Sequence, residues 1–501
     1  MTESQISINS LLAPESVAFI GASNDPTKWG CIILKNMLHG GYAGPIYPVN
    51  PKEKEVLGLK AYASVAALPE TPEMAVIVIP PPAVPAAVED CVKKGVRAGL
   101  VITAGFAEVG PEGKKLQTAM VANAKKGGMI LIGPNCNGIS RPSANFFPQM
   151  PSIFPGSGPL AAVAQSGNVA ASLIRRGIKK GFGFSAVFSI GNEADLHCED
   201  FLKFLGDDPE TKVIVGYMEG FKDGRRFFNV AREVTVKKPI VMVKAGSTGA
   251  GAKAAMSHTA SLSGEDATFD GLCKQSGIIR TDSIDDMFGI GTGFLNQPLP
   301  KGNKVGIVTM GGGWGVLAAD TSANFGLDVV TLSSRTIARL DEILPSWWNR
   351  GNPVDMVAGT VGGVVPESVR ILMEAPETDC VILLGVLGLM KKRPGPSDGK
   401  PDLVEKQIRE ALQDLSDAFD WLKSLSHQYQ KPLVIASEIP FTLGDFENRM
   451  VQMLGQKQIA CYNSPNMAAR VMSRLVAYGR YRRHYSKMKP TEGGKNGIQG
   501  A

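Results

Sequence analysis

Short, continuous apolar segments recur through the first 140 residues, and each is followed by a stretch long enough for a helix with its loops. The segments are Ser16 to Ile20, Ile46 to Val49, Met74 to Ile79, Gly99 to Thr103 and Met129 to Ile132. Continuous apolar runs indicate strands buried on both faces of a parallel sheet, because a half-exposed strand alternates apolar and polar residues. The 15 to 25 residues between them suffice for crossover helices. We therefore predict a doubly wound α/β domain over residues 1–142.

Two more series of the same kind follow this Rossmann-like domain. After a proline-rich connector at 143–159, apolar runs lie at 160–164, 186–189, 213–217 and 240–244, and a third series occupies 304–309, 328–332, 380–385 and 432–437. Each series opens with a strand, a glycine-rich turn and a helix, AAVAQSGNVAASL and GIVTMGGGWGVLAA. We predict two flavodoxin-like domains, 143–298 and 299–480. The basic, glycine-rich segment 481–501 is predicted to be a disordered tail.

Composition excludes several classes of protein. The 53 Lys and Arg residues barely exceed the 47 Asp and Glu residues, and no basic run has the density of a nucleic-acid footprint. Seven scattered cysteines without Cys-x-x-Cys pairs predict a reducing compartment and no structural metal. No apolar run approaches 18 residues, and the first residues lack the pattern of a secretory signal. We expect a cytoplasmic protein that binds neither membranes nor nucleic acids.

Five loops of the first domain are expected to share one ligand-binding edge. The first strand ends in GASNDPTKWG, a turn that aims backbone N–H groups at an anion. It lacks the G-x-G-x-x-G fingerprint of dinucleotide sites, and alone it equally fits a glycine required for a tight turn. PVNPK, IPPPAV, ITAGF and IGPNCNGI follow the next strands, at the carboxyl edge where doubly wound folds bind ligands. Lys28 and Lys52 are candidate phosphate partners, or else solvated surface lysines.

His258 is the candidate for covalent chemistry. It lies in KAGSTGAGAKAAMSHTASLSG, residues 244–264, where small neighbours leave an imidazole accessible; the alternative is a structural histidine. A histidine that accepts phosphate must be neutral at the attacking nitrogen and held at the other, usually by a carboxylate. Glu219 ends a strand of the same predicted sheet, although it also fits a helix N-terminus. Ser166, Gly167 and Asn168 begin the helix after QSGN and are candidates for the phosphate cradle.

These motifs together resemble one enzyme family. GASNDPTKWG, PVNPK, ITAGF-x-E, IGPNCNGI, QSGN, SIGNEADL, DDPETKVIVGYMEG and the SHTA loop, in this order, are similar to the α subunit of ADP-forming acetyl-CoA synthetase, a relative of the succinyl-CoA synthetase α subunit. The resemblance runs from about residue 10 to 480. It implies a CoA-binding domain followed by two succinyl-CoA-synthetase-type domains. The implied CoA-site residues are Gly21, Ser23, Lys28, Asn50, Lys52, Pro80, Thr103, Gly105, Asn135 and Cys136.

The resemblance also implies a reaction. An acid, CoA and ATP yield acyl-CoA, ADP and phosphate, reversibly, through an acyl phosphate and a phosphohistidine. His258 matches the phosphorylated residue, Glu219 its carboxylate partner, and 166–168 the phosphate-binding helix start. Because the sequence has no ATP-grasp domain and no Walker loop, a β subunit would supply ATP with Mg²⁺, in an α2β2 assembly.

Two positions depart from the family pattern. Ala260 replaces a usual glycine after Ser-His-Thr, and Ala171 stands where succinyl-CoA synthetases have tyrosine, which predicts a small carboxylic acid other than succinate. A CoA-binding regulatory protein that has lost catalysis is the alternative hypothesis. A nicotinamide dehydrogenase is disfavoured by the missing glycine fingerprint.

Overall fold

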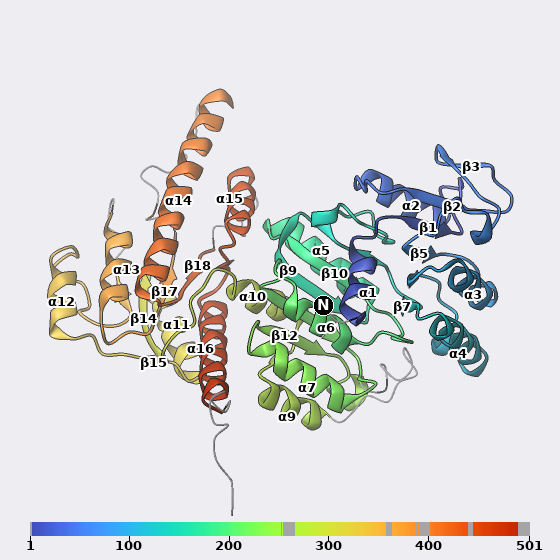
Figure 1. Ribbon diagram of the computed structural model, residues 1–501. Helices are drawn as coiled ribbons and strands as arrows, with labels where there is room; N and C mark the ends of the chain where they lie inside the picture. The colour runs from blue at the N-terminus through green and yellow to red at the C-terminus, as the bar shows by residue number, and fades with distance from the viewer. Residues whose placement is uncertain are drawn as a thin grey trace, which may run out of the picture. The chain divides into compact units, whose positions relative to one another are not determined.

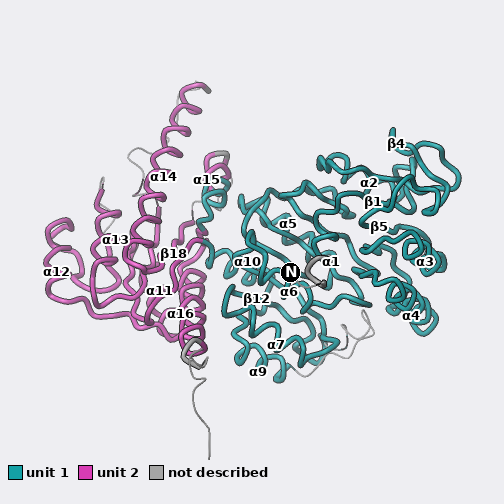
Figure 2. Tube along the Cα trace, in the orientation of Figure 1, with its two compact units in different colours: residues 1–295, 451–459 teal, residues 296–450, 460–501 magenta. Residues whose placement is uncertain are grey.

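The computed structural model describes residues 3–251, 253, 266–356, 363–386, 389, 401–438 and 444–488. It divides into two compact units, coloured separately in Figure 2. Unit 1 comprises residues 1–295 and 451–459, and unit 2 comprises residues 296–450 and 460–501. The predicted α/β class is confirmed, because both units are built from parallel sheets covered by helices (Figure 1).

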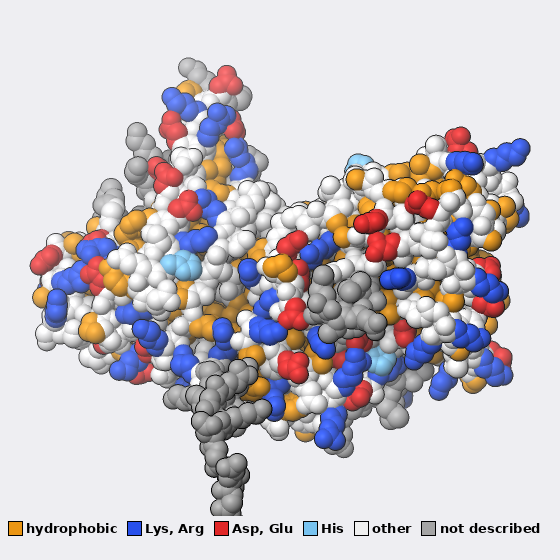
Figure 3. Space-filling model, in the orientation of Figure 1, with side chains coloured by type: hydrophobic (Ala, Val, Ile, Leu, Met, Phe, Trp, Pro, Cys, Tyr) orange, Lys and Arg blue, Asp and Glu red, His pale blue; other side chains and the backbone are white. Residues whose placement is uncertain are grey.

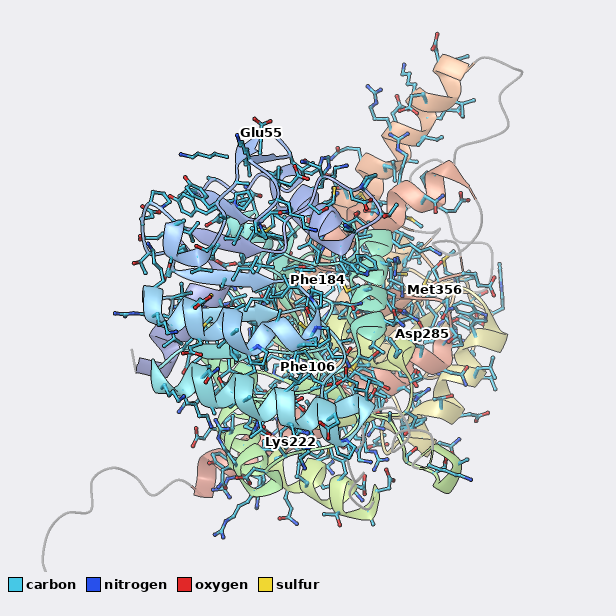
Figure 4. All side chains as sticks on the ribbon, turned by 90° about the vertical axis from the view of Figure 1, so that its right-hand side faces the viewer. Glu55, Phe106, Phe184, Lys222, Asp285 and Met356 are labelled. Carbon is cyan, nitrogen blue, oxygen red and sulfur yellow. The ribbon has the colours of Figure 1, made fainter. Side chains whose placement is uncertain are left out.

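The first sheet of unit 1 has five parallel strands in the order β2-β1-β5-β6-β7. The strands are β1 Val17–Ile20, β2 Ile46–Val49, β5 Met74–Ile77, β6 Ala98–Val101 and β7 Ile130–Ile132, and the helices are α1 Glu3–Leu12, α2 Trp29–His39, α3 Val84–Lys94 and α4 Pro111–Lys126. A hairpin not foreseen from the sequence, β3 Glu55–Val56 with β4 Leu59–Lys60, follows β2. In Figure 4 its residue Glu55 lies at the outer tip of the domain.

Both faces of this sheet are buried, as its continuous apolar strands predict. Val17 and Phe19 pack in one cluster with residues of α1 and α2, whereas Ala18 and Ile20 pack in a second cluster with residues of α3 and α4. All four side chains are at most 5% exposed. The alternation along β1 sends successive side chains to opposite faces, so helices must cover the sheet on both sides.

The second sheet of unit 1 has the order β13-β12-β11-β9-β10-β8, in which only the short β8 is antiparallel to its neighbour. Its strands are β8 Ile139–Ser140, β9 Ser157–Ala164, β10 Phe184–Ser189, β11 Val213–Met218, β12 Ile240–Lys244 and β13 Ile279–Thr281. Its helices are α5 Gly167–Lys180, α6 Cys198–Asp207, α7 Gly224–Thr235, α9 Asp266–Ser276 and α10 Ile284–Gly293. Leaving β8 aside, the chain order is 2-1-3-4-5, the flavodoxin-like arrangement.

One hydrophobic core joins the two sheets of unit 1. The cluster that contains Phe19 and Leu100 of the first sheet also contains Val163 and Phe188 of the second. A boundary at 142/143 therefore separates two sheets that pack as one body. The domain limits themselves stay a prediction.

Unit 2 repeats the order of the other sheets, with β15-β14-β17-β18-β19 and a short β16 beside β14. The strands are β14 Lys304–Thr309, β15 Asp328–Val329, β16 Val354–Asp355, β17 Cys380–Leu384, β18 Leu433–Ala436 and β19 Cys461–Tyr462. The helices are α11 Gly312–Asn324, α12 Ser334–Asp341, α13 Val364–Glu374, α14 Pro401–Tyr429, α15 Asp445–Gln456 and α16 Pro465–Met488. The predicted tail from residue 481 is therefore wrong for its first part, since helix α16 continues to Met488.

The surface agrees with the charge balance of the sequence. On the face that Figure 3 shows, acidic and basic side chains of the described residues are interspersed. Within the described part of the chain, no helix is both long and apolar enough to cross a membrane, and no group of three or more potential metal ligands occurs. All seven cysteines are free.

Candidate active site

The five loops predicted to form a ligand edge contact one another in the order of the strands. The Asn50 amide donates to the Ala22 carbonyl at 2.9 Å, and the Thr103 hydroxyl donates to the Ile79 carbonyl at 2.8 Å. The Asn135 backbone N–H donates to the Thr103 carbonyl at 2.9 Å. These bonds connect the loop after β1 with the loop after β2, and the loop after β6 with the loops after β5 and β7. Since the strands are parallel, all five predicted loops lie at one edge of the sheet.

Gly21 is required by the close approach of two backbones. Its φ is +95°, and a Cβ there would lie 2.2 Å from the Val78 carbonyl oxygen. A Cβ on Gly30 would lie 2.0 Å from the Gly21 carbonyl oxygen. The first loop is thus folded tightly between β5 and the start of α2, so its glycines are required for a tight turn, and ligand binding by this loop stays a prediction.

The remaining CoA-site candidates differ in accessibility. Lys28, Lys52 and Pro80 are exposed, and the Lys28 ammonium lies 3.8 Å from the Asp25 carboxylate. The Ser23 hydroxyl accepts a bond from the Asp25 N–H at 3.1 Å. The Gly105 N–H donates to Glu108 at 2.6 Å.

Cys136 does not present its thiol to this edge. Its side chain is 3% exposed, belongs to the core, and donates to the Val101 carbonyl at 3.3 Å. Burial raises the pKa of the thiol to about 12. The thiol of Cys136 is therefore not available to a ligand at this edge.

The carboxyl ends of β9, β10 and β11 form a second polar site. In flavodoxin-like sheets ligands bind where the strand order reverses, beside the first and third strands, which here are β9 and β11. Gln165 follows β9, and Glu219 follows β11 with 6% exposure. The Gln165 side-chain oxygen accepts bonds from the N–H groups of Glu219 and, at 3.2 Å, Gly220. Glu219 therefore lies at the reversal point, held by its backbone.

The predicted phosphate cradle begins helix α5 beside this point. Ser166 is the N-cap residue, and its side chain makes no capping hydrogen bond. A Cβ on Gly167 would lie 2.2 Å from the Asn137 side chain, so only glycine lets the IGPNCNGI turn approach the helix start. Asn168 is exposed. The helix is 14 residues long, and its N-terminus favours an anion.

Tyr217 adds a phenol near Glu219. Its hydroxyl lies 3.4 Å from the Glu219 carboxylate, and burial, followed by that carboxylate, raises the tyrosine pKa to about 12. The phenol therefore stays protonated and can donate.

His258 and Ala260 lie outside the described residues. Their loop leaves the sheet after Lys244, the end of β12, and β12 pairs with β11.

The turn between β10 and α6 connects the two sites, and sequence reasoning assigned none of its residues. The Asn192 amide donates to Glu108 at 2.5 Å and lies 3.2 Å from the Asn135 side chain. Glu193 accepts a bond from the Gln165 amide and another from the Cys198 N–H at 2.6 Å. A signal was available, because SIGNEADL and ITAGF-x-E both follow strands of these sheets.

Comparison with known proteins agrees with this geometry. A CoA-binding-domain family matches residues 15–142, and the succinyl-CoA ligase-like flavodoxin domain matches residues 157–294. The α subunit of acetate–CoA ligase (ADP-forming) I from Pyrococcus furiosus is 37% identical over 95% of this chain and 99% of its own. The α subunit of ligase II from the same organism is 42% identical over 75% of this chain and 81% of its own. The chain belongs to this ligase family.

The family assignment confirms the resemblance and makes the chain an acid–thiol ligase of the ADP-forming class. A solved structure of the acetyl-CoA synthetase 1 of Candidatus Korarchaeum cryptofilum, in complex with phosphate and ADP, matches 96% of this chain with a TM-score of 0.84 and 32% identity. The acetate–CoA ligase I of Archaeoglobus fulgidus is 39% identical over 75% of this chain, which spans 54% of that relative. The ligase family therefore includes separate α subunits and longer single chains.

Proposed function

We propose that this chain is the CoA-binding subunit of an ADP-forming acyl-CoA synthetase that works through a phosphorylated His258. The observation that carries the proposal is the placement of Glu219 at the reversal point of the second sheet, beside the N-terminus of α5. A phosphoryl-accepting imidazole needs a carboxylate at its second nitrogen and N–H donors for the phosphate. The loop with His258 starts from the neighbouring strand β12.

The chemistry divides between the two sites. Phosphohistidine gives its phosphoryl group to the acid, so that the N–P bond breaks and an acyl phosphate forms. The CoA sulfur then bonds to the acyl carbon, the bond from that carbon to the phosphate oxygen breaks, and the thiol proton leaves with phosphate. Glu219 holds the imidazole N–H throughout. The amides that begin α5, at Ser166, Gly167 and Asn168, stabilise the phosphoryl oxygens.

The first-sheet edge would hold CoA. Its linked loops offer backbone N–H groups, and Lys28 and Lys52 at their rim offer charges for the CoA phosphates. The turn that carries Asn192 connects this edge with the phosphate site. The thiol end of CoA can therefore meet an acyl phosphate held beside α5.

A partner completes the reaction. We propose a β subunit with an ATP-grasp domain that binds ATP with Mg²⁺, in an α2β2 assembly, since the relatives matched over most of their length are α subunits. We propose a small acid other than succinate, because Ala171 within α5 stands where succinyl-CoA synthetases have tyrosine. We expect the protein to be cytoplasmic, because its scattered cysteines fit a reducing compartment.

Labelling with radioactive acetyl phosphate tests the proposal on the chain itself. His258 attacks phosphorus, acetate leaves with the electron pair of the broken P–O bond, and an acid-labile, alkali-stable label results. The wild type should take up about one phosphate per chain, and His258→Ala none. Equal labelling of the two proteins would refute the assignment. CoA binding without any label would instead favour the regulatory alternative.

A further inference from the structure

The Gln165 side chain uses all of its hydrogen-bonding capacity at the reversal point of the second sheet. Its oxygen accepts from two consecutive backbone N–H groups, those of Glu219 and Gly220. Its nitrogen donates to the Gly220 carbonyl at 2.9 Å and to the Glu193 carboxylate. A carboxamide has one acceptor oxygen and two donor hydrogens. This pattern therefore fits one orientation of the amide only.

Glu193 fixes that orientation from the other side. It is 3% exposed, and its φ of +51° lies in the left-handed region. One carboxylate oxygen accepts from Gln165, and the other accepts from the Cys198 N–H at the start of α6. Both oxygens face donors, so the ionised form satisfies the contacts. The charged groups that face it are His197 at the start of α6 and Lys222 after β11.

We propose that Glu193 is a positioning residue that acts through Gln165 to place Glu219 for phosphoryl transfer. The inference rests on the proposed function, in which Glu219 holds His258. Glu193, Gln165 and Glu219 follow the adjacent strands β10, β9 and β11, so their contacts run straight across the edge where the phosphate would lie. Errors of about 1 Å in such placement can slow a reaction roughly a hundredfold.

The structure distinguishes this role from mere packing. Burial raises the pKa of Glu193 to about 7, whereas the bonds from Gln165 and the Cys198 N–H favour the ionised carboxylate. Glu193→Gln has nearly the same volume. Its amide nitrogen, however, would face either the Gln165 amide nitrogen or the Cys198 N–H, so that two donors would lie opposite each other. The isosteric variant should therefore fail in function while it folds.

Hydrogen exchange of the full-length chain tests the contact without reference to activity. In Glu193→Gln and Glu193→Ala, the amides of Glu219 and Gly220 should exchange at least about fivefold faster, because Gln165 no longer holds them firmly. Ser185→Ala is the matched control. It removes a buried hydroxyl, bonded to Thr211 at 2.7 Å, from the opposite end of the same strand β10. The proposal requires unchanged exchange at 219 and 220 in this control.

Labelling by acetyl phosphate then tests the functional step. The initial rate per folded chain should fall about tenfold to a hundredfold in both Glu193 variants and in Gln165→Ala. Since Glu193 acts through Gln165, the double variant Gln165→Ala/Glu193→Ala should be no slower than Gln165→Ala alone. Ser185→Ala should label at the wild-type rate.

The outcomes separate the two proposals. Wild-type labelling rates in the Glu193 variants, or a double variant slowed by the product of the single effects, would overturn the positioning role. Equal labelling of the wild type and His258→Ala would refute the proposed function instead, and faster exchange in the Glu193 variants would then still establish the contact with Gln165.

Discussion

Glu193 and Glu219 are both buried carboxyl groups at one edge of the second sheet, and their surroundings assign them different tasks. Glu193 has a donor at each oxygen and lies behind Gln165. Glu219 is held through its backbone and has the Tyr217 phenol 3.4 Å from its side chain. In the proposed function Glu219 contacts the imidazole, because it lies at the reversal point beside the start of α5, whereas Glu193 acts through Gln165.

Glu219→Gln should keep the fold and slow phosphorylation. The amide has the shape of the carboxylate but not its charge, so it holds a developing imidazolium poorly. We expect the rate of labelling by acetyl phosphate to fall about a hundredfold. CoA affinity, measured by calorimetry, should stay within about twofold, because the CoA edge lies on another sheet. A variant labelled as fast as the wild type would contradict the role of Glu219.

Glu193 should also make stability depend on pH. Burial raises its pKa from 4.5 to about 7, so the folded chain keeps this proton over a range where the unfolded chain loses it. The resulting stabilisation is complete below about pH 4.5 and is lost as pH rises through about 7. The Glu193→Gln variant does not show this loss of stability, because glutamine does not titrate. Its melting temperature relative to the wild type should therefore increase from pH 5 to pH 8, and a constant difference would refute the shifted pKa.

At the scale of elements, strand ends separated by tens of residues meet because all three sheets share the order 2-1-3-4-5. In this order the first strand lies centrally and its loop has neighbours on both sides. The loops after β1 and β9 occupy that position, and both are among the loops for which sequence reasoning predicted ligands. In unit 2, the glycine-rich turn before α11 occupies the corresponding position, because it follows β14, the first strand of that sheet.

Thr103→Val should weaken CoA binding without affecting phosphorylation. The hydroxyl connects the loops after β6 and β5 through a 2.8 Å bond to Ile79, and valine keeps the volume. Loss of one such bond costs about 1 kcal/mol, so the CoA dissociation constant should rise about fivefold. Calorimetry with CoA measures it. Unchanged affinity would exclude this edge as the CoA site.

Most strands could be predicted from the sequence because buried parallel strands are continuous apolar runs. The prediction at 304–309 coincides with β14, whereas short edge strands such as β8 and β13 carry too few apolar residues for detection. The sequence prediction ended helix α16 too early, because the basic residues after 481 resemble a solvated tail. In the structure the helix continues to Met488. The Gln165–Glu193 contact could not be predicted, since it depends on which strands become neighbours.

For the whole molecule, the described residues form two units, of which unit 1 contains both candidate sites. The sheets that carry the two candidate sites thus share one hydrophobic core. This arrangement suits a subunit that receives a phosphoryl group from elsewhere and delivers it to CoA chemistry. The proposed function predicts that the chain depends on a partner subunit for the use of ATP.

The chain alone should form no acyl-CoA from acetate, CoA and MgATP. Addition of an ATP-grasp β subunit should start the reaction and give a complex with two copies of each chain, because phosphohistidine then forms from ATP. Coupled detection of ADP and analytical ultracentrifugation measure the two effects. Full ATP-dependent activity of the isolated chain would contradict the division of labour.

The most direct test of the phosphohistidine pathway is a chase of the labelled chain. The phosphorylated protein, freed of acetyl phosphate, is mixed with acetate and CoA, and both the label and acetyl-CoA are followed over time. We predict that about one acetyl-CoA forms for each phosphate released, at matching rates, and that neither acetate nor CoA alone yields acetyl-CoA. Acetyl-CoA that forms while the label stays on the chain, or label lost without acetyl-CoA, would contradict the account.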